Sequence, residues 1–234
     1  MSWTYEIALR AEPEYHARLH DWFADGAREA YARLPGLASF DLYSPADGTS
    51  RDPYNNDGAG PAMMLMLDFK SREALAAAVR SRAIAAPLAD LPHGIAATGA
   101  AFERRFYPVG EERAPSALEA PFSYVVRYHH PADDVAAFID NYLATHPVTQ
   151  ARLPAIRSII CYVPLDDLAS QDQEPHLTPA DYMIGNEVVF DHIDAFNAAM
   201  ASPVRQELRA HYHAFPRFTG ANTHYPMTRR RVFG

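Results

Sequence analysis

Cysteine is almost absent from this sequence, which has only Cys161 among 234 residues. A lone cysteine cannot form a disulfide within the chain, so the fold does not depend on oxidation. No apolar run approaches the roughly 20 residues that span a bilayer, and the first residues lack the basic start and apolar core of a secretory signal. We therefore expect a cytoplasmic protein with no membrane partner.

Basic residues are in the minority, with 21 lysines and arginines against 29 acidic residues and a formal net charge of −8. Proteins that bind nucleic acids usually present a wide basic surface to the phosphate backbone. The one basic cluster, at residues 229–231, is more simply interpreted as a solvated strand end. The composition therefore predicts no nucleic-acid partner.

The motifs that commonly hold metals, nucleotides or acyl groups are missing as well. The sequence has no C-x-x-C, no H-E-x-x-H, no glycine-rich phosphate loop and no G-x-S-x-G. Each of these motifs places ligands or a nucleophile at the spacing that its chemistry needs. We expect no metal site and no cofactor, although the eleven histidines leave an axial haem ligand open.

What the sequence does contain is an ordered internal repeat. RLPGL at 33–37 recurs as RLPAI at 152–156, FKSREAL at 69–75 as FDHIDAF at 190–196, and TGA at 98–100 as TGA at 219–221. Self-similarity at a nearly constant offset, here 119 to 121 residues, indicates a duplicated structural unit. We assign residues 1–110 to the first unit, 121–234 to the second, and the charged segment 111–120 to a linker.

Both units show the same succession of strand and helix signals. Residues 3–9 alternate apolar and polar side chains, as in a strand with one buried face. Residues 135–143 place apolar side chains at i, i+3, i+4, i+7 and i+8, as in an amphipathic helix. Further strands are expected at 38–43, 63–69, 100–107, 122–128, 158–163, 182–190 and within 221–233, and further helices near 15–23, 71–85 and 194–214, the last broken near 202–203.

The order βαββαβ, found twice, is the ferredoxin-like plan of an α+β protein. One such unit has helices on one face of its sheet, so the other face needs cover. Two units in one chain can cover each other with their antiparallel sheets face to face. We therefore predict a fused pseudo-dimer, and leave open whether two such chains form a homodimer.

The second unit resembles the EthD-like branch of the dimeric α/β-barrel superfamily. The resemblance lies in DNYLATHPV at 140–148, RLP at 152–154, FDHIDAF at 190–196, SP at 202–203 and RFT at 217–219. Ala155 replaces the glycine that family members carry after Leu-Pro, and the first unit has Ala27 where the second has His146. The resemblance implies a dimeric α/β barrel within a superfamily of cofactor-independent monooxygenases, lactone isomerases, polyketide cyclases and haem enzymes.

His146 is the candidate catalytic residue. It lies eleven positions after Val135, about three helical turns along the same apolar stripe, and we expect Pro147 to end the helix just after it. An imidazole there could face a cavity and move a proton; the simpler alternative is a histidine bound to a backbone carbonyl or to solvent. Tyr142, on the same stripe, and Tyr128, near the end of the unit's first strand, are candidate substrate-binding residues.

Arg127 and Glu187 are the charged candidates for substrate binding. If the aromatic face of each first strand packs on the helices, Arg127 and Glu6 point into the space between the sheets, and Glu187 is a similar case. Buried charges need partners. These residues therefore form either a structural ion-pair network across the pseudo-dimer or a substrate site in which the arginine binds an anion.

Two kinds of function remain open. The first is an enzyme, namely a cofactor-independent oxygenase, isomerase or cyclase acting on a small aromatic or cyclic substrate in a pocket between sheet and helices. The second is a non-catalytic protein that binds a small hydrophobic molecule or assists a catabolic or biosynthetic pathway. A pocket histidine with a polar partner and a perturbed pKa favours the enzyme, whereas an all-apolar lining favours the binding protein. The pocket is expected in the second unit, which has polar residues where the first has apolar ones.

Overall fold

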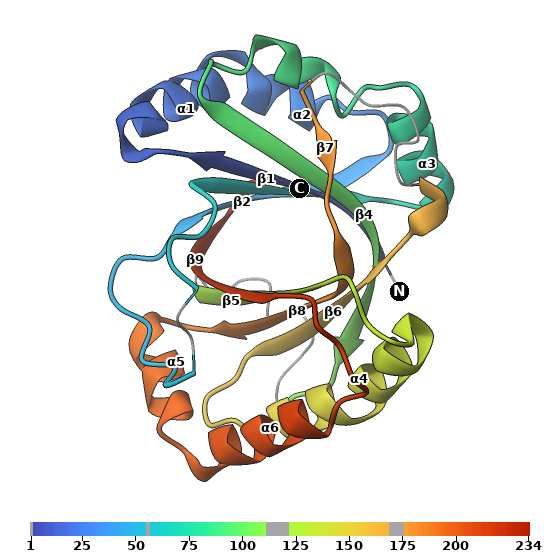
Figure 1. Ribbon diagram of the computed structural model, residues 1–234. Helices are drawn as coiled ribbons and strands as arrows, with labels where there is room; N and C mark the ends of the chain where they lie inside the picture. The colour runs from blue at the N-terminus through green and yellow to red at the C-terminus, as the bar shows by residue number, and fades with distance from the viewer. Residues whose placement is uncertain (1, 55–56, 111–121, 169–175) are drawn as a thin grey trace.

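The computed structural model describes residues 2–54, 57–110, 122–168 and 176–234, so the predicted linker 111–120 lies outside the described residues. Figure 1 shows a barrel of strands between two layers of helices, one from each half of the chain. No helix in the described ranges is long and apolar enough to cross a membrane.

The elements confirm the predicted βαββαβ order in both halves. The first half contains β1 (Ser2–Ala11), α1 (His16–Trp22), α2 (Arg28–Ala32), β2 (Leu37–Pro45), β3 (Met63–Phe69), α3 (Arg72–Arg80) and β4 (Ile95–Tyr107). The second half contains β5 (Phe122–His129), α4 (Val135–Gln150), β6 (Ser158–Pro164), β7 (Thr178–Pro179), β8 (Tyr182–Phe190), α5 (Ile193–Met200), α6 (Pro203–Ala214) and β9 (Asn222–Phe233). The short strand β7 is an addition to the predicted strands.

Eight strands of the described chain close into one antiparallel barrel. Their order around the ring is β1, β3, β2, β9, β5, β8, β6 and β4, and β4 pairs with β1 to complete it. The two halves meet at two seams, where β2 pairs with β9 and β4 pairs with β6. The prediction of a dimeric α/β barrel within one chain is confirmed, and the two sheets are joined through their edges as well as facing each other.

Three apolar clusters follow from the alternation of side chains along the strands. Tyr5, Ile7 and Leu9 of β1 point outward and pack with the first-half helices, as the period of two predicts. The outward side chains of the second half, such as Tyr124 and Tyr128, pack in the same way against α4, α5 and α6. The third cluster fills the inside of the barrel with residues of both halves, including Phe102 and Tyr162. Each sheet is therefore covered on both faces.

The helix that carries the candidate histidine is longer than predicted. Pro147 lies inside α4, which continues to Gln150, so the expectation that Pro147 ends the helix is wrong. Proline has no N–H to donate to the carbonyl four residues earlier, which is that of Leu143. The hydroxyl of Tyr107 on β4 donates to that carbonyl at 3.0 Å instead. A partner from the barrel thus satisfies the group that the proline leaves free, and the helix continues.

Two further helices differ from their predicted extents. The first helical segment is interrupted by a π-helical stretch, Phe23–Ala27, between α1 and α2. The helix predicted to reach residue 85 ends at Arg80, and Arg82 just beyond it has a positive φ of 60°. The predicted break near residues 202–203 is confirmed, because α5 ends at Met200 and α6 begins at Pro203.

The repeated turn after the first helix of each half requires a left-handed backbone. Gly36 has a φ of 78°, and Ala155, its counterpart in the second half, has a φ of 58°. A side chain in this conformation is strained by about 1–2 kcal/mol, a strain that glycine does not have. A Cβ at Gly36 would also lie 2.6 Å from the Cβ of Ala74. The backbone of this turn is therefore strained at Ala155 in the second half and not at Gly36 in the first.

We predict that Gly36→Ala and Ala155→Gly change stability in opposite directions. Gly36→Ala should lower the free energy of unfolding by about 2 kcal/mol or more, through backbone strain and the contact with Ala74. Ala155→Gly relieves strain but makes the unfolded chain more flexible, so a gain of roughly 0.5 kcal/mol is expected. Urea unfolding of both variants measures the two values. A loss of stability in Ala155→Gly would contradict the strain that we assign to this turn.

Candidate functional site

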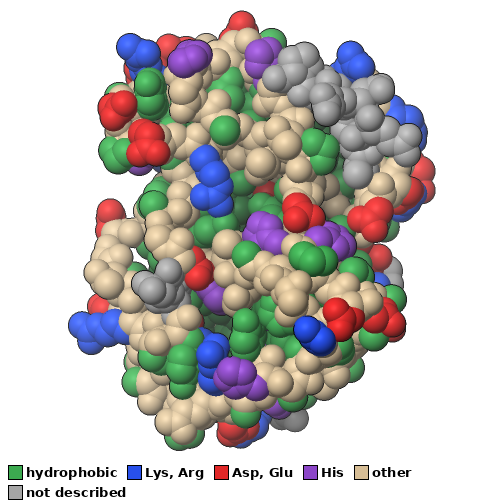
Figure 2. All heavy atoms as spheres, viewed as in Figure 1, with side chains coloured by type: hydrophobic (Ala, Val, Ile, Leu, Met, Phe, Trp, Pro, Cys, Tyr) green, Lys and Arg blue, Asp and Glu red, His purple; other side chains and the backbone are tan. Residues whose placement is uncertain are grey.

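The second half contains a cavity between the outer face of its sheet and its helices. The cavity holds about 600 Å³ of empty space, its open mouth included, which lies in the range of pockets that bind small organic molecules. Figure 2 shows a hollow in this face of the second half, with hydrophobic side chains inside and basic and histidine side chains at its edge. The lining comes from β5, β8, β9, α4, α6 and the loop after β2.

Helix α4 provides the inner wall through one row of side chains. Tyr142, His146 and Gln150 follow one another at intervals of four residues, so they lie above each other on one face of the helix. All three are buried and line the cavity. The apolar stripe that the sequence predicted therefore continues into polar residues where the helix reaches the cavity.

His146 is an almost fully enclosed imidazole, with 8% of the residue exposed. Its ring lies 4.9 Å from the ring of Tyr142 and 5.3 Å from that of Phe215, centre to centre. Burial, with smaller contributions from His211, Arg205 and His224, lowers its pKa to about 3. Its Nδ1 atom is buried without a hydrogen-bond partner in the described structure. The ring is therefore neutral at neutral pH.

Tyr142 and Tyr128 meet His146 in one aromatic group. The rings of Tyr128 and Tyr142 lie 5.3 Å apart and line the same cavity. Burial raises the pKa of both hydroxyls, with the nearby hydroxyl of Tyr212 adding to the effect at Tyr128 and that of Tyr128 at Tyr142. Both tyrosines therefore stay protonated, and the wall around the imidazole is aromatic and uncharged.

Arg127 and Glu187 lie on the other side of the sheet, inside the barrel and away from this cavity. The Arg127 guanidinium is fully buried and forms an ion pair with Glu6 of the first half, its Nε donating at 3.0 Å. Burial lowers the pKa of Arg127, but the Glu6 carboxylate more than offsets this and raises it. The sequence left a structural pair and a ligand site open, and this contact satisfies the guanidinium within the protein.

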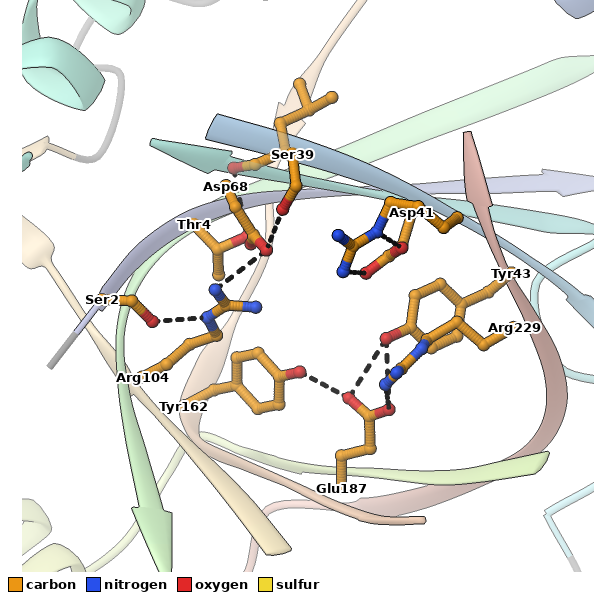
Figure 3. Close-up of polar contacts among 12 residues, drawn as sticks. Ser2, Thr4, Ser39, Asp41, Tyr43, Asp68, Arg104, Tyr162, Glu187 and Arg229 are labelled. Atoms are coloured by element: carbon orange, nitrogen blue, oxygen red, sulfur yellow. Dashed lines mark hydrogen bonds and ion pairs between the residues drawn. The ribbon is translucent and has the colours of Figure 1, made fainter. Parts of the chain in front are cut away.

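Glu187 is the centre of a second network inside the barrel (Figure 3). Its carboxylate accepts hydrogen bonds from the hydroxyls of Tyr43, Tyr162 and Ser123 and pairs with Arg229 at 3.2 Å. Burial raises the pKa of Glu187, but Arg229 and the hydroxyls of Ser123 and Tyr162 outweigh it and hold the pKa below its usual value. These contacts occupy the acceptor sites of the carboxylate, so Glu187 stabilises the inside of the barrel.

The long loop after β2, part of the first half, closes one side of the cavity. Asp52 accepts hydrogen bonds from Nε and Nη2 of Arg205 on α6, at 3.0 and 2.8 Å, and from the hydroxyl of Tyr124 at 2.9 Å. Asp57 in the same loop pairs with His224 of β9 at 2.6 Å. Neither Asp52 nor Asp57 is among the site residues that the sequence predicted.

The first half has no matching histidine. Trp22, Phe23 and Ala27 occupy the positions of Asn141, Tyr142 and His146 in the repeat, and they are buried in the apolar cluster between sheet and helices. In the described ranges, no group of three or more histidine, cysteine or acidic side chains is arranged to hold a metal ion. The polar cavity is thus a property of the second half.

Solved structures match this chain over nearly its whole length, although no protein-family model and no curated protein sequence match it. An anthrone oxidase-like protein has a TM-score of 0.58 and 13% identity, with 99% of this chain and 93% of that chain covered. A candidate monooxygenase from Lactobacillus acidophilus NCFM has a TM-score of 0.51 and 8% identity, with 99% and 95% covered. One from Fusobacterium nucleatum has a TM-score of 0.51 and 10% identity, with 98% and 92% covered.

At these identities the likeness shows the fold alone, the dimeric α/β barrel formed within one chain. The EthD-like resemblance of the second unit remains a prediction.

The low pKa of His146 predicts a loss of stability on the acid side. An unfolded histidine takes up a proton near pH 6.5, whereas His146 in the folded chain does so near pH 3. Between these values the unfolded state binds more protons, so stability falls as the pH falls through this window. From pH 7 to pH 5 the native protein should lose about 2 kcal/mol more than His146→Leu. Chemical unfolding at both pH values tests this, and equal losses would contradict the buried neutral imidazole.

Proposed function

We propose that the cavity of the second half binds a small aromatic phenol or methylene ketone and that the chain catalyses its oxygenation. The observation that carries this proposal is the neutral, enclosed imidazole of His146, which is buried among aromatic rings in the wall of the cavity. Ligand pockets typically combine apolar walls with a few polar groups that fix orientation, and this lining has that composition. The EthD-like resemblance points to the same half of the chain.

The chemistry follows from what a neutral imidazole can do in a dry site. His146 can accept the proton of a phenol, or of a methylene group made acidic by a neighbouring aromatic ketone. The resulting anion is electron-rich and reacts with molecular oxygen. Because an adjacent negative charge favours the imidazolium, the bound anion would itself raise the pKa of His146. The low value in the free protein keeps the ring unprotonated until the substrate arrives.

For an aromatic methylene ketone the reaction balances with oxygen as the sole oxidant. One C–H bond gives its proton to His146, and the carbanion adds O₂ to form a peroxide anion, which recovers the proton from His146. Loss of the second hydrogen with cleavage of the O–O bond gives a carbonyl group and one water. The choice of oxygenation over isomerisation or cyclisation is supported by the descriptions of the similar structures, an anthrone oxidase-like protein and two candidate monooxygenases.

A binding protein without catalysis is the second candidate, and one observation favours it. The described structure gives His146 no polar partner at Nδ1 that would orient the ring or increase its basicity, whereas catalytic histidines commonly have one. The perturbed pKa favours the enzyme and the missing partner favours the binding protein, so activity must decide between them.

We expect the chain to accelerate oxygen uptake by anthrone, and His146→Ala to reduce the rate constant by about 100-fold or more, the usual contribution of a general base. The matched control is Trp22→Ala in the first half. Trp22 is 9% exposed and donates to the carbonyl of Pro87 at 3.2 Å, so its loss should lower stability by about 3–5 kcal/mol. Well below its unfolding temperature, this variant should keep the rate.

The assay uses an oxygen electrode, with protein-free anthrone as the blank because the compound also oxidises slowly in water. Uptake by His146→Ala at the native rate would show that this histidine is not the base. Binding of anthrone without faster uptake would establish the binding protein and overturn the oxygenase.

A further inference from the structure

Two arginines of α6 share one aromatic ring at the edge of the cavity. The guanidinium of Arg205 lies 4.6 Å from the centre of the Tyr54 ring, and that of Arg209 lies 4.8 Å from it. Like charges this close repel each other unless carboxylates compensate them. Arg205 is compensated, because Asp52 accepts three hydrogen bonds from it.

Arg209 is the guanidinium without such compensation. Within the described ranges it has no carboxylate partner, and it lies between two rings, with Tyr212 at 4.9 Å on α6 itself. The next carboxylate of this loop, Asp57, accepts hydrogen bonds from the ring Nδ1 and the backbone N–H of His224 at 2.6 and 2.7 Å. With respect to the described residues, the cavity edge therefore carries an arginine whose charge and fork of donors are available to a ligand.

The inner wall of the cavity, in contrast, has acceptor groups that need hydrogen-bond donors from a ligand. Gln150 is 6% exposed, and its Oε1 is buried without a partner, as is Nδ1 of His146 one helical turn earlier. The orientation of the Gln150 amide follows from its neighbours. Asn186 donates through Nδ2 to the carbonyl of Ile160, so its Oδ1 must accept, and Nε2 of Gln150 donates to it at 2.7 Å. The acceptor Oε1 therefore remains for a ligand.

A buried acceptor without a partner destabilises a protein unless a bound group supplies a donor. A neutral imidazole and an amide oxygen on adjacent turns of α4 suit hydroxyl groups on one end of a ligand. A guanidinium with free N–H groups at the cavity edge suits a carboxylate or similar oxyanion on the other end. Between them the cavity wall is aromatic, with Tyr128, Tyr142 and Tyr212.

We propose that the ligand is a hydroxylated aromatic acid, bound with a hydroxyl group at Gln150 and His146 and its acidic group at Arg209. This inference rests on the proposed function and specifies its substrate class. Arg209 is the residue that selects the acid, and Gln150 the residue that selects the hydroxyl.

Calorimetric titration with three naphthalene probes tests the assignment on the full chain. The probe 6-hydroxy-2-naphthoate carries both groups at opposite ends, 2-naphthol has only the hydroxyl, and 2-naphthoate has only the acid. The native protein should bind the double probe roughly tenfold or more tightly than either single probe. Arg209→Met should remove the preference over 2-naphthol, and Gln150→Leu should reduce the preference over 2-naphthoate. Arg33→Met, which removes an exposed first-half arginine, is the matched control and should bind like the native chain.

Two further measurements test the role of Arg209 if Arg209→Met does not fold. Arg209→Lys retains the charge and should keep part of the preference for the acid. In the native protein, added salt should weaken binding of the acid probes and leave 2-naphthol nearly unchanged, because salt screens the charge of a partly exposed arginine.

The outcomes separate this inference from the proposed function. Equal affinity of the native protein for the double probe and 2-naphthol would overturn the role of Arg209 and leave the aromatic cavity in place. An unchanged acid preference in Arg209→Met would overturn it in the same way. If none of the three probes binds, the inference and the proposed function both fail.

Discussion

The rest of this structure depends on the closure of eight strands into one barrel, because closure buries charged groups that contact partners in the other half. Glu6 pairs with Arg127, Asp41 with Arg231, and Glu187 accepts from Tyr43, each pair joining one half to the other. A buried charge without its partner destabilises a fold strongly. Asp41 and Arg231 lie opposite each other across the β2–β9 seam, so their ion pair favours that register. The described helices pack outside the barrel.

The site follows from this arrangement. Since the barrel interior is filled by rings and ion pairs, the space for a ligand lies on the helical side of the sheet, where α4 and α6 frame it in the second half. The first half contributes the loop that carries Asp52 and Asp57. The second half thus forms most of the site, and a loop of the first half closes one side of it.

The sequence predicted what local periodicity encodes. The alternation along residues 3–9 and the stripe in α4 located the strand and the helix correctly, and the repeat implied the barrel. It did not predict the length of α4, because the group that replaces the missing N–H of Pro147 is Tyr107 of the other half. Nor did it reveal Asp52, Gln150 or Arg209 as site residues. Their roles depend on which groups they contact among the described residues of the folded chain, and the sequence does not show these contacts. The sequence correctly predicted that Arg127 and Glu187 face the inside of the barrel. It left open whether their partners are protein groups or a ligand.

The most direct test of this account is a crystal structure of the chain with 6-hydroxy-2-naphthoate bound. The account predicts one molecule in the second-half cavity, its hydroxyl group about 2.7–3.2 Å from Nδ1 of His146 or Oε1 of Gln150 and its carboxylate on Arg209. A molecule bound inside the barrel against Arg127 or Arg229, or bound only in the first half, would contradict it.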